Sequence, residues 1–235
     1  KNLENRALIA LQGPASETVL SEHYSKISKM HFMDVSTIPI AGAECWISRS
    51  GYTGEDGFEI SIPNKAAEIV TDTLLKHKSV ELVGLGARDS LRLEAGLCLY
   101  GQDIDTTTSP VAAGLKWAMH KSRLSEEQQE GSFPGANTIL SEIKNGSEYK
   151  LVGFVPLGKA PIRADTQLFV NSTSSAPIGR ITSGLFSPTQ KHPIAVGYIK
   201  SEFSCLGNRV DAKVRGKFLE IEVTPLPFVK KNFKK

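Results

Sequence analysis

The sequence is poor in the residues that build cross-linked, metal-binding or membrane-embedded proteins. Its three cysteines are widely separated among 235 residues, which argues against a disulfide framework and a CxxC metal site. The five histidines show no ligand spacing, so no metal ion is expected. No apolar run approaches the roughly 20 residues that a membrane-spanning helix requires. We therefore expect a soluble protein with reduced thiols and with neither a metal nor a membrane partner.

An excess of one sign of charge is also lacking, which argues against a nucleic-acid partner. Lys+Arg is 28 and Asp+Glu is 25, which gives a net charge of +3. The basic residues are scattered, except for four lysines close to the C-terminus, where a solvated tail is the expected state. Hydrophobic residues make up 40% of the chain, which is too many for a disordered protein and enough for a core.

Common catalytic signatures are missing as well. The chain contains no GxGxxG segment after a strand, no P-loop, no HExxH and no GxSxG. The sequence therefore gives no support to hydride transfer on a bound nucleotide, to metal-assisted hydrolysis or to a serine triad.

Hydrophobic periodicity divides the chain into two parts, and the first part is of the α+β class. Residues 7–11 form a continuous apolar run, which predicts a buried strand. Alternation in residues 57–62 places Phe58, Ile60 and Ile62 on one face of a strand and Glu59 on the other. Within residues 1–120 we expect strands at 7–11, 35–40, 43–48 and 57–62, and helices at 15–23, 63–75 and 86–96.

The second part is rich in short strands. Six candidates separated by turn residues predict a small β-sandwich or barrel. They lie at 151–156, 167–171, 177–182, 195–200, 210–215 and 218–223. Residues 121–150 are polar at first and then include a short helix at 136–144, so we expect a connection there. The predicted fold is α+β: a partial ferredoxin-like α/β domain at 1–120, then an antiparallel β-barrel or jelly-roll-like domain at 151–235.

One candidate site lies in the glycine-rich segment before Glu59. Gly51, Gly54 and Gly57 allow the backbone to approach a partner closely or to take a positive φ. If the polar face of the following strand lines a cavity, Glu59 is a fixed acceptor for a pair of N–H donors. Otherwise Glu59 lies on the solvent face of an amphipathic strand, and spacing alone favours this second alternative.

A second candidate site lies on the helix expected at 86–96. Arg88 and Arg92 are four residues apart and share a helix face. An arginine near the start of a helix binds a carboxylate or carbonyl group in forked geometry. The alternative is a surface face on which Asp89 or Glu94 forms salt bridges, and the pattern alone favours this alternative.

Taken together, several segments resemble one family throughout the chain. The most specific block is GLGARDSLRLEAG at 84–96, supported by LQGP at 11–14 and GYTGE at 51–55. Further blocks are YGQDID at 100–105, SP at 109–110, PIR at 161–163, ITSG at 181–184, FSPT at 186–189 and PFV at 227–229. In this order they resemble the glycine cleavage system T-protein family of aminomethyltransferases.

The resemblance implies tetrahydrofolate-dependent chemistry without a metal. Members of this family take the aminomethyl group from the lipoyl arm of H-protein, release ammonia and pass the one-carbon unit to tetrahydrofolate. Lipoylated H-protein and folate are therefore the expected partners. The basic residues Arg209, Lys213, Arg215 and Lys217 are candidates for meeting an acidic partner, although for each residue singly a solvated surface is the favoured alternative.

The resemblance also assigns four substrate-binding residues. The family's pterin-binding glutamate corresponds to Glu59, and its substrate-binding arginine corresponds to Arg88. Tyr52 is expected beside the pterin or in a structural role. Phe233 stands where the family carries a tyrosine, so any role of that hydroxyl is lost.

Two other residues are expected to be structural. Arg163, in the PIR block, is expected to be a buried arginine, and Trp117 is expected to lie in the core.

The sequence departs from the family at its start. In the family, roughly the first third of the chain precedes the LQGP block and carries the catalytic aspartate, and nothing here corresponds to it. Asp103 and Asp105 belong to a different block and do not take over this role. We therefore expect a fragment of a three-domain enzyme, with its catalytic residue unknown.

Several alternatives to the aminomethyltransferase function stay open. They are a related folate-dependent demethylase, the folate domain of an amine dehydrogenase, a non-catalytic folate-binding protein of iron–sulfur maintenance, and an inactive remnant. The expected location is the bacterial cytoplasm, or the mitochondrial matrix if the source is a eukaryote.

Overall fold

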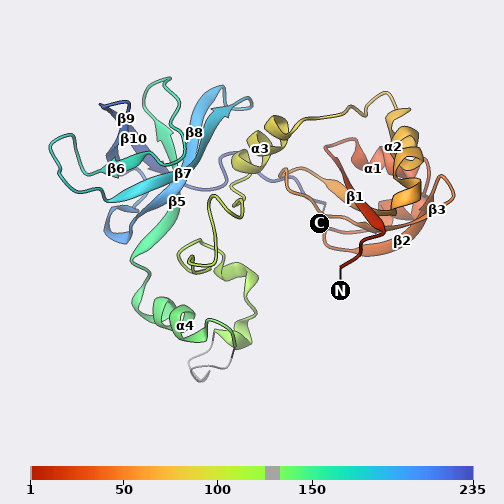
Figure 1. Ribbon diagram of the computed structural model, residues 1–235, viewed down its shortest axis with the longest axis horizontal. Helices are drawn as coiled ribbons and strands as arrows, with labels where there is room; N and C mark the ends of the chain where they lie inside the picture. The colour runs from red at the N-terminus through yellow and green to blue at the C-terminus, as the bar shows by residue number, and fades with distance from the viewer. Residues whose placement is uncertain (1, 125–132, 235) are drawn as a thin grey trace. The chain divides into compact units, whose positions relative to one another are not determined.

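The computed structural model describes residues 2–124 and 133–234, which fold into two units (Figure 1). Unit 1 comprises Lys1–Ala95 together with Lys230–Lys235, and unit 2 comprises Gly96–Val229. Part of the connection predicted at 121–150 lies outside the described residues. Among the described residues, no helix combines the length and the apolar character needed to cross a membrane.

Unit 1 contains a four-stranded antiparallel sheet, and α1, η1 and α2 pack on one face of it. The strands follow the order β1-β4-β3-β2 across the sheet. They are β1 (Arg6–Gln12), β2 (Val35–Ile40), β3 (Ala43–Ser48) and β4 (Gly57–Pro63). The helical elements are α1 (Ser16–Ser21), η1 (Ser25–Lys29), η2 (Asn64–Ala66), α2 (Ala67–Leu75) and α3 (Leu85–Glu94).

The core of unit 1 lies between the sheet and the helices. Phe58, Ile60 and Ile62 of β4 are fully buried, as the predicted alternation requires. Val70 and Leu74 of α2 are buried in the same core. The opposite face of β4 carries half-buried polar side chains, and this face holds the candidate site.

Residues 7–11 form a strand as expected, but the expectation that this strand is fully buried is wrong. The segment is the strand β1, but β1 is an edge strand that pairs only with β4. Its Leu8 is 67% exposed, whereas Ile9 and Leu11 pack against the core. An edge strand with one covered face buries only alternate side chains, even when all of them are apolar.

The helix α3 (Leu85–Glu94) confirms the helix predicted at 86–96 to within two residues, and a glycine lies close to each of its ends. Gly84 precedes it in an extended conformation, and Gly96 follows Ala95 with a φ of 64°. Arg92 is nevertheless buried, with Asp89 as an ion-pair partner at 2.7 Å. The ion pair expected with Asp89 is thus confirmed for Arg92, but its expected surface location is wrong, whereas Arg88 is exposed.

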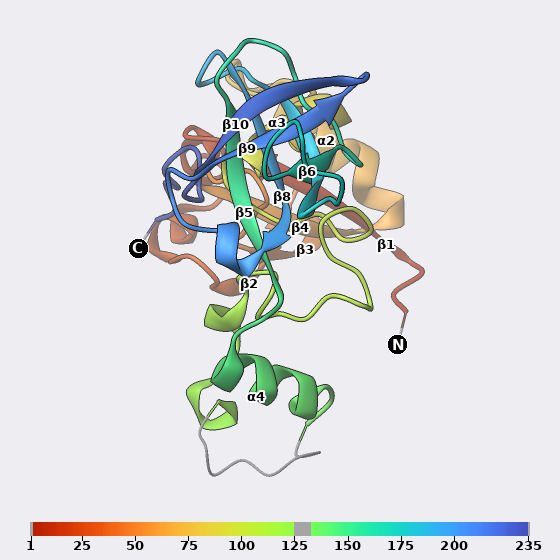
Figure 2. The same ribbon diagram turned by 90° about the vertical axis from the view of Figure 1, so that its left-hand side faces the viewer.

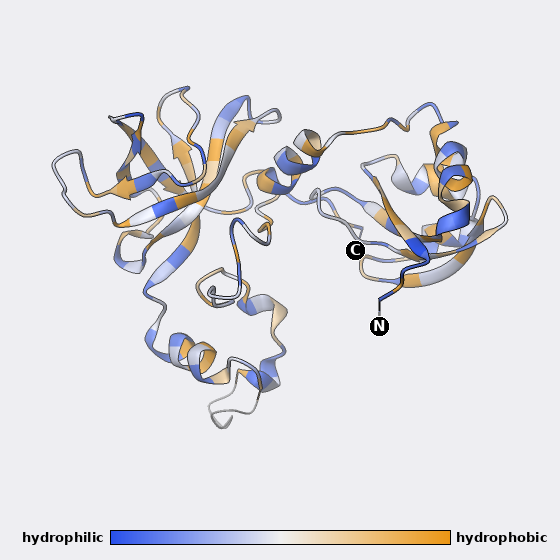
Figure 3. Cartoon of the chain, viewed as in Figure 1, coloured by the Kyte–Doolittle hydropathy of each residue, from blue (hydrophilic) through white to orange (hydrophobic). Residues whose placement is uncertain are grey.

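Unit 2 contains a closed barrel whose six strands confirm the six predicted ones. Neighbouring strands pair antiparallel around the ring β10-β5-β8-β7-β6-β9. The strands are β5 (Tyr149–Pro156), β6 (Gln167–Phe169), β7 (Gly179–Ser187), β8 (His192–Lys200), β9 (Arg209–Val214) and β10 (Lys217–Thr224). Figure 3 shows hydrophobic bands along the strands of both units. The predicted α+β class with a C-terminal antiparallel barrel is confirmed.

The segment before the barrel consists largely of turns. It includes η3 (Lys116–Ala118), η4 (Lys121–Arg123) and α4 (Ala136–Asn145), and η5 (Ser201–Phe203) follows β8. Figure 2 shows α4 beyond the end of β5, away from the barrel strands. The helix predicted at 136–144 is confirmed.

The C-terminal tail returns to unit 1. The backbone N–H of Asn232 donates to the carbonyl of Gly54 at 2.7 Å, and that of Phe32 donates to the carbonyl of Lys234 at 3.1 Å. The Lys234 ammonium lies 2.8 Å from a carboxylate oxygen of Glu17. The expectation of a solvated tail is therefore wrong for Lys234.

Candidate functional site

Glu59 lies on a central strand, on the sheet face that the helices leave open. The register places it between Ala10 of β1 and Ser48 of β3. The residue is half-buried, and the Ser50 hydroxyl donates to its Oε2 atom at 2.8 Å. Its Oε1 atom accepts no hydrogen bond from the described part of the chain. The carboxylate is thus held at one oxygen and available at the other.

The amide of Gln12 joins the two segments that carry Ser50 and Glu59. Its Nε2 atom donates to the carbonyl of Ser50 at 3.0 Å and to that of Phe58 at 3.3 Å. The Thr53 hydroxyl donates to its Oε1 atom at 3.2 Å. Gln12 therefore connects the end of β1, the glycine-rich loop and the start of β4.

The glycines at 51 and 57 make room for this amide. A Cβ atom at Gly51 would lie 1.8 Å from Oε1 of Gln12, and one at Gly57 would lie 2.5 Å from Cδ of the same side chain. Both contacts are far inside van der Waals distance. The glycine-rich motif is therefore explained at these two positions by close approach of Gln12, in agreement with one of the two roles expected for these glycines.

Arg88 and Tyr52, two further residues predicted to bind substrate, contact each other in unit 1. Arg88 is an exposed residue of the first turn of α3, and its guanidinium carbon lies 5.2 Å from the centroid of the Tyr52 ring. This distance is within the range of a cation–π interaction. The sequence places Tyr52 two residues after Ser50, so the same loop carries a residue that contacts Glu59 and a residue that contacts Arg88. We call Gln12, Ser50, Tyr52, Glu59 and Arg88 the Glu59 site.

Phe233 lies in unit 1, in the returning C-terminal tail. Its ring stacks on Phe32 with centroids 4.3 Å apart and planes 12° apart. The preceding residue, Asn232, binds the carbonyl of Gly54 in the glycine-rich loop. The tail thus brings Phe233 to the unit that carries Glu59, although its observed aromatic partner is Phe32.

A buried arginine that sequence reasoning missed supports the glycine-rich loop. Arg49 is fully buried and forms ion pairs with Glu17 and Asp56. Hydrogen bonds from Lys234 and Arg49 outweigh burial and hold the pKa of Glu17 below its usual range. The alternation of side chains along β3 could have predicted this burial. Cys45 and Ile47 are buried in the core, and Arg49 occupies the next alternate position.

Two expectations about structural residues are wrong. Arg163 is exposed rather than buried, and its backbone carbonyl closes a turn by accepting hydrogen bonds from Thr166. Trp117 is 77% exposed and lies in a short 3-10 turn rather than in a core. Both lie in segments outside regular strands, where amphipathic periodicity gives no guide to burial.

The YGQDID segment contributes hydrogen bonds to the fold of unit 2. The buried Asp103 accepts hydrogen bonds from the hydroxyls of Thr182 at 2.5 Å and Ser183 at 2.7 Å, and from the Leu99 N–H at 2.8 Å. Hydrogen bonds from Thr107 hold the pKa of Asp105 below its usual range. The expectation that neither aspartate replaces a catalytic one stays a prediction.

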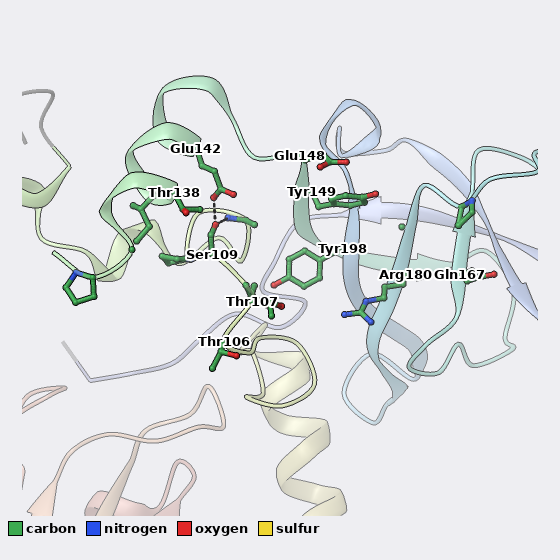
Figure 4. Close-up of a pocket in the computed structure, with 18 residues that line it drawn as sticks. Thr106, Thr107, Ser109, Thr138, Glu142, Glu148, Tyr149, Gln167, Arg180 and Tyr198 are labelled. Carbon is green, nitrogen blue, oxygen red and sulfur yellow. Dashed lines mark hydrogen bonds between the residues drawn. The ribbon is translucent and has the colours of Figure 1, made fainter. Parts of the chain in front are cut away.

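Unit 2 also contains an open cavity of about 860 Å³. Figure 4 shows Glu142 of α4 pointing toward Ser109, to which it is hydrogen-bonded, and Arg180 and Tyr198 coming from paired strands of the barrel. Burial raises the pKa of Tyr198. This cavity contains none of the four predicted site residues.

The basic residues on β9 and β10 of the barrel differ in whether acidic residues of the chain already pair with them. Arg209 lies 3.3 Å from Glu222 and 3.6 Å from Glu220, so acidic residues of β10 already accompany it. Lys213, Arg215 and Lys217 are exposed at the β9–β10 hairpin. Within the described part of the chain, no group of three or more histidine, cysteine or acidic residues has the arrangement of a metal site.

Comparison with known proteins agrees with these features in both units. A family model described as the GCVT N-terminal domain matches residues 2–123, and one described as the glycine cleavage T-protein C-terminal barrel domain matches residues 150–230. The chain belongs to the glycine cleavage T-protein family. The barrel assigned to this family corresponds to the closed six-stranded barrel of unit 2.

Known members of the T-protein family are similar over nearly the whole chain. The mitochondrial aminomethyltransferase of Solanum tuberosum is 44% identical over 236 residues, covering 99% of this chain and 56% of that protein. The mitochondrial aminomethyltransferase of Dictyostelium discoideum is 41% identical over 242 residues, covering 99% of this chain and 59% of that protein. The chain therefore spans less than two thirds of the length of these relatives.

A solved structure agrees with the same assignment. The glycine cleavage system aminomethyltransferase T from Bartonella henselae superposes with a TM-score of 0.88 at 40% sequence identity. The match covers 98% of this chain and 61% of that chain. The relatives from Solanum tuberosum and Dictyostelium discoideum are described as mitochondrial, which does not confirm the cytoplasmic location that was expected first for this chain.

Proposed function

We propose that the chain binds tetrahydrofolate as part of a glycine cleavage system aminomethyltransferase. The observation that carries this proposal is the Glu59 carboxylate, which is held by Ser50 on the open face of the sheet in a chain of the T-protein family. The family acts with tetrahydrofolate, and the proposal extends that property to this chain and to these residues.

In this proposal Glu59 recognises the pterin ring. The edge of a pterin presents an amino group and a ring N–H side by side, and a carboxylate accepts both donors in bidentate fashion. The available Oε1 atom and the remaining lone pair of Oε2 provide the two acceptor positions that this pairing needs. The two donors and the two acceptor positions therefore match in number.

Arg88 and Tyr52 complete the proposed binding site. The exposed guanidinium of Arg88 offers forked donors to a carbonyl or carboxylate oxygen of the substrate. Its position against the Tyr52 ring limits its freedom before a ligand arrives. Phe233 is proposed to contact the substrate only through its ring, because it lacks a hydroxyl.

The reaction proposed for the whole enzyme transfers one carbon between two substrates. The C–S and C–N bonds of the aminomethyl group on lipoylated H-protein break, and the methylene carbon becomes bonded to two nitrogens of tetrahydrofolate. The two hydrogens lost from those nitrogens leave on the sulfur and on the ammonia. No residue of this chain is assigned to the catalytic step.

The exposed hairpin residues Lys213, Arg215 and Lys217 are proposed contacts for an acidic surface of H-protein.

The mitochondrial matrix is the location that we propose for the protein. The names of the two relatives described above identify them as mitochondrial. Cell fractionation of the source organism tests this proposal, and recovery of the protein in the cytosolic fraction would contradict it.

Calorimetric titration of the chain with tetrahydrofolate tests the proposed function. We expect saturable binding that Glu59→Ala weakens by at least about tenfold, because a charged acceptor of two hydrogen bonds is lost. Lys65→Ala, on the surface of η2, is the control and should leave the affinity unchanged. Wild-type chain that takes up no tetrahydrofolate would contradict the proposal.

A further inference from the structure

We propose that Ser50 and Gln12 are positioning residues that orient the Glu59 carboxylate for its ligand. This inference rests on the proposed function, because it explains how the pterin-binding carboxylate is prepared. Neither side chain is proposed to touch the reacting atoms. Both are proposed to act through Glu59, one on its carboxylate and the other on the backbone around it.

The Ser50 hydroxyl fixes one oxygen of Glu59 in a defined direction. A serine hydroxyl has a single hydrogen to donate, and Ser50 lies 2.8 Å from Oε2 of Glu59. The Ser48 and Ser50 hydroxyls are 2.7 Å apart. Because an ionised carboxylate only accepts, Ser50 donates to Glu59 and Ser48 must donate to Ser50. The three side chains therefore form a directed chain of hydrogen bonds that ends on the carboxylate.

The hydrogen bond from Ser50 restrains the Glu59 carboxylate and still leaves acceptor positions for a ligand. A carboxylate has about four acceptor positions, and Ser50 occupies one of them. A free glutamate side chain loses rotamer freedom when it binds a ligand, which lowers the affinity. A glutamate that is already restrained loses less freedom, so Ser50 is expected to favour binding although it does not contact the ligand.

Gln12 fixes the backbone at both ends of this interaction. Its amide binds the carbonyl of Ser50 and the carbonyl of Phe58, the residue that precedes Glu59. Gln12 therefore holds Ser50 and the start of β4 together beyond the point where β3 pairs with β4 at Ser48 and Glu59. The absence of Cβ atoms at Gly51 and Gly57 allows this side chain to fit.

A double-mutant cycle on the full chain tests the role of Ser50. Tetrahydrofolate affinity is measured for wild type, Ser50→Ala, Glu59→Ala and the double variant. We expect Ser50→Ala alone to weaken binding about tenfold, in line with the loss of a hydrogen bond to a charged group. In the Glu59→Ala background the same change should have no further effect, because Ser50 acts only through Glu59.

Two further variants separate positioning from a general structural role. Ser50→Thr keeps a hydroxyl and should bind nearly as well as wild type. Ser28→Ala removes an exposed hydroxyl that binds only the carbonyl of Ser25, and it should leave affinity unchanged. Equal losses for Ser50→Ala in both backgrounds would overturn the proposal, since they would mean that Ser50 does not act through Glu59.

The outcomes also distinguish this inference from the proposed function. If Glu59→Ala weakens binding and Ser50→Ala does not, the inference fails while the proposed function stands. If wild type does not bind tetrahydrofolate, the proposed function fails, and a crystal structure of Ser50→Ala then tests the inference by itself. We expect the Glu59 carboxylate to occupy more than one rotamer in that variant, and a single unchanged position would overturn the inference.

Discussion

The two units each place a carboxylate near hydroxyl groups, but with opposite results. In the barrel unit, Asp103 is buried and accepts hydrogen bonds from Thr182, Ser183 and the Leu99 backbone. In the sheet unit, Glu59 is half-buried and has one hydroxyl donor, Ser50. A carboxylate with several protein donors stabilises the fold, whereas one that keeps acceptor positions available can bind a ligand.

The architecture of each unit explains this difference. A closed barrel has no free sheet edge, and its inward residues pack against one another or against the segment that covers them. The four-stranded sheet is open, and in the described part of unit 1 the core that packs on it comes from α1, η1 and α2 on one face. Side chains on the other face of β4 therefore remain accessible while their backbone is held rigidly by neighbouring strands.

The largest expected effect is on the stability of the barrel unit. Asp103→Ala should lower the free energy of unfolding of unit 2 by roughly 3 kcal/mol, because buried hydroxyl and N–H donors lose their acceptor. Amide hydrogen exchange in the peptides of β5 to β10 measures this loss. Asp105→Ala, an exposed residue two positions away, is the matched control and should have a much smaller effect. If Asp103→Ala leaves the hydrogen-exchange protection of these peptides unchanged, Asp103 does not stabilise the fold in the way that distinguishes it from Glu59.

A smaller effect is expected from filling the space that Gln12 occupies. Gly57→Ala should reduce the stability of unit 1 by about 1–2 kcal/mol, because its Cβ atom displaces the Gln12 amide. Gln12→Ala removes the side chain that the Cβ atom would meet. We therefore expect the loss caused by Gly57→Ala to be smaller in the Gln12→Ala background. Denaturant unfolding of the four proteins measures this, and additive losses would mean that Gly57 is required for another reason.

The smallest expected effect concerns pH and the tail of unit 1. The pKa of Glu17 in the folded chain lies below its usual value of 4.5, chiefly because of a hydrogen bond from Lys234. Since the folded-state pKa is the lower one, the contribution of Glu17 is present above about pH 4.5 and is lost as the pH falls below it. The loss should be no more than about 1 kcal/mol, because the pair is partly exposed.

Thermal unfolding of wild type and Glu17→Gln between pH 3 and pH 6 checks the sign of this contribution. The difference in stability between the two proteins should shrink as the solution becomes more acidic. A difference that grows toward low pH would show that the ionised Glu17 does not stabilise the folded state.

Local patterns in the sequence predicted most of the elements. The strands β2 and β3 begin and end at the predicted residues, and all six barrel strands were expected within a few positions. These elements depend on alternation and on turn residues, which are properties of neighbouring positions. The burial of Leu8 was predicted wrongly because the position of a strand within its sheet depends on distant segments.

The candidate site was predictable only in part for the same reason. Family resemblance indicated Glu59 and Arg88, but spacing alone favoured a solvent face for both. The contacts of Gln12 with Ser50 and Phe58 join residues 38 and 46 positions apart, and no local periodicity reports such pairs. Arg49 was missed because a charged residue at an inward position becomes understandable only when its partners, Glu17 and Asp56, are known.

The most direct test compares the two carboxylates in one titration series. Tetrahydrofolate binding is measured for wild type, Glu59→Gln and Asp103→Asn, which remove one negative charge each with little change in shape. We predict that Glu59→Gln weakens binding by at least about tenfold and that Asp103→Asn leaves the affinity of the folded protein unchanged. Equal affinities for wild type and Glu59→Gln, or a loss confined to Asp103→Asn, would contradict the assignment of Glu59 as the folate-binding carboxylate.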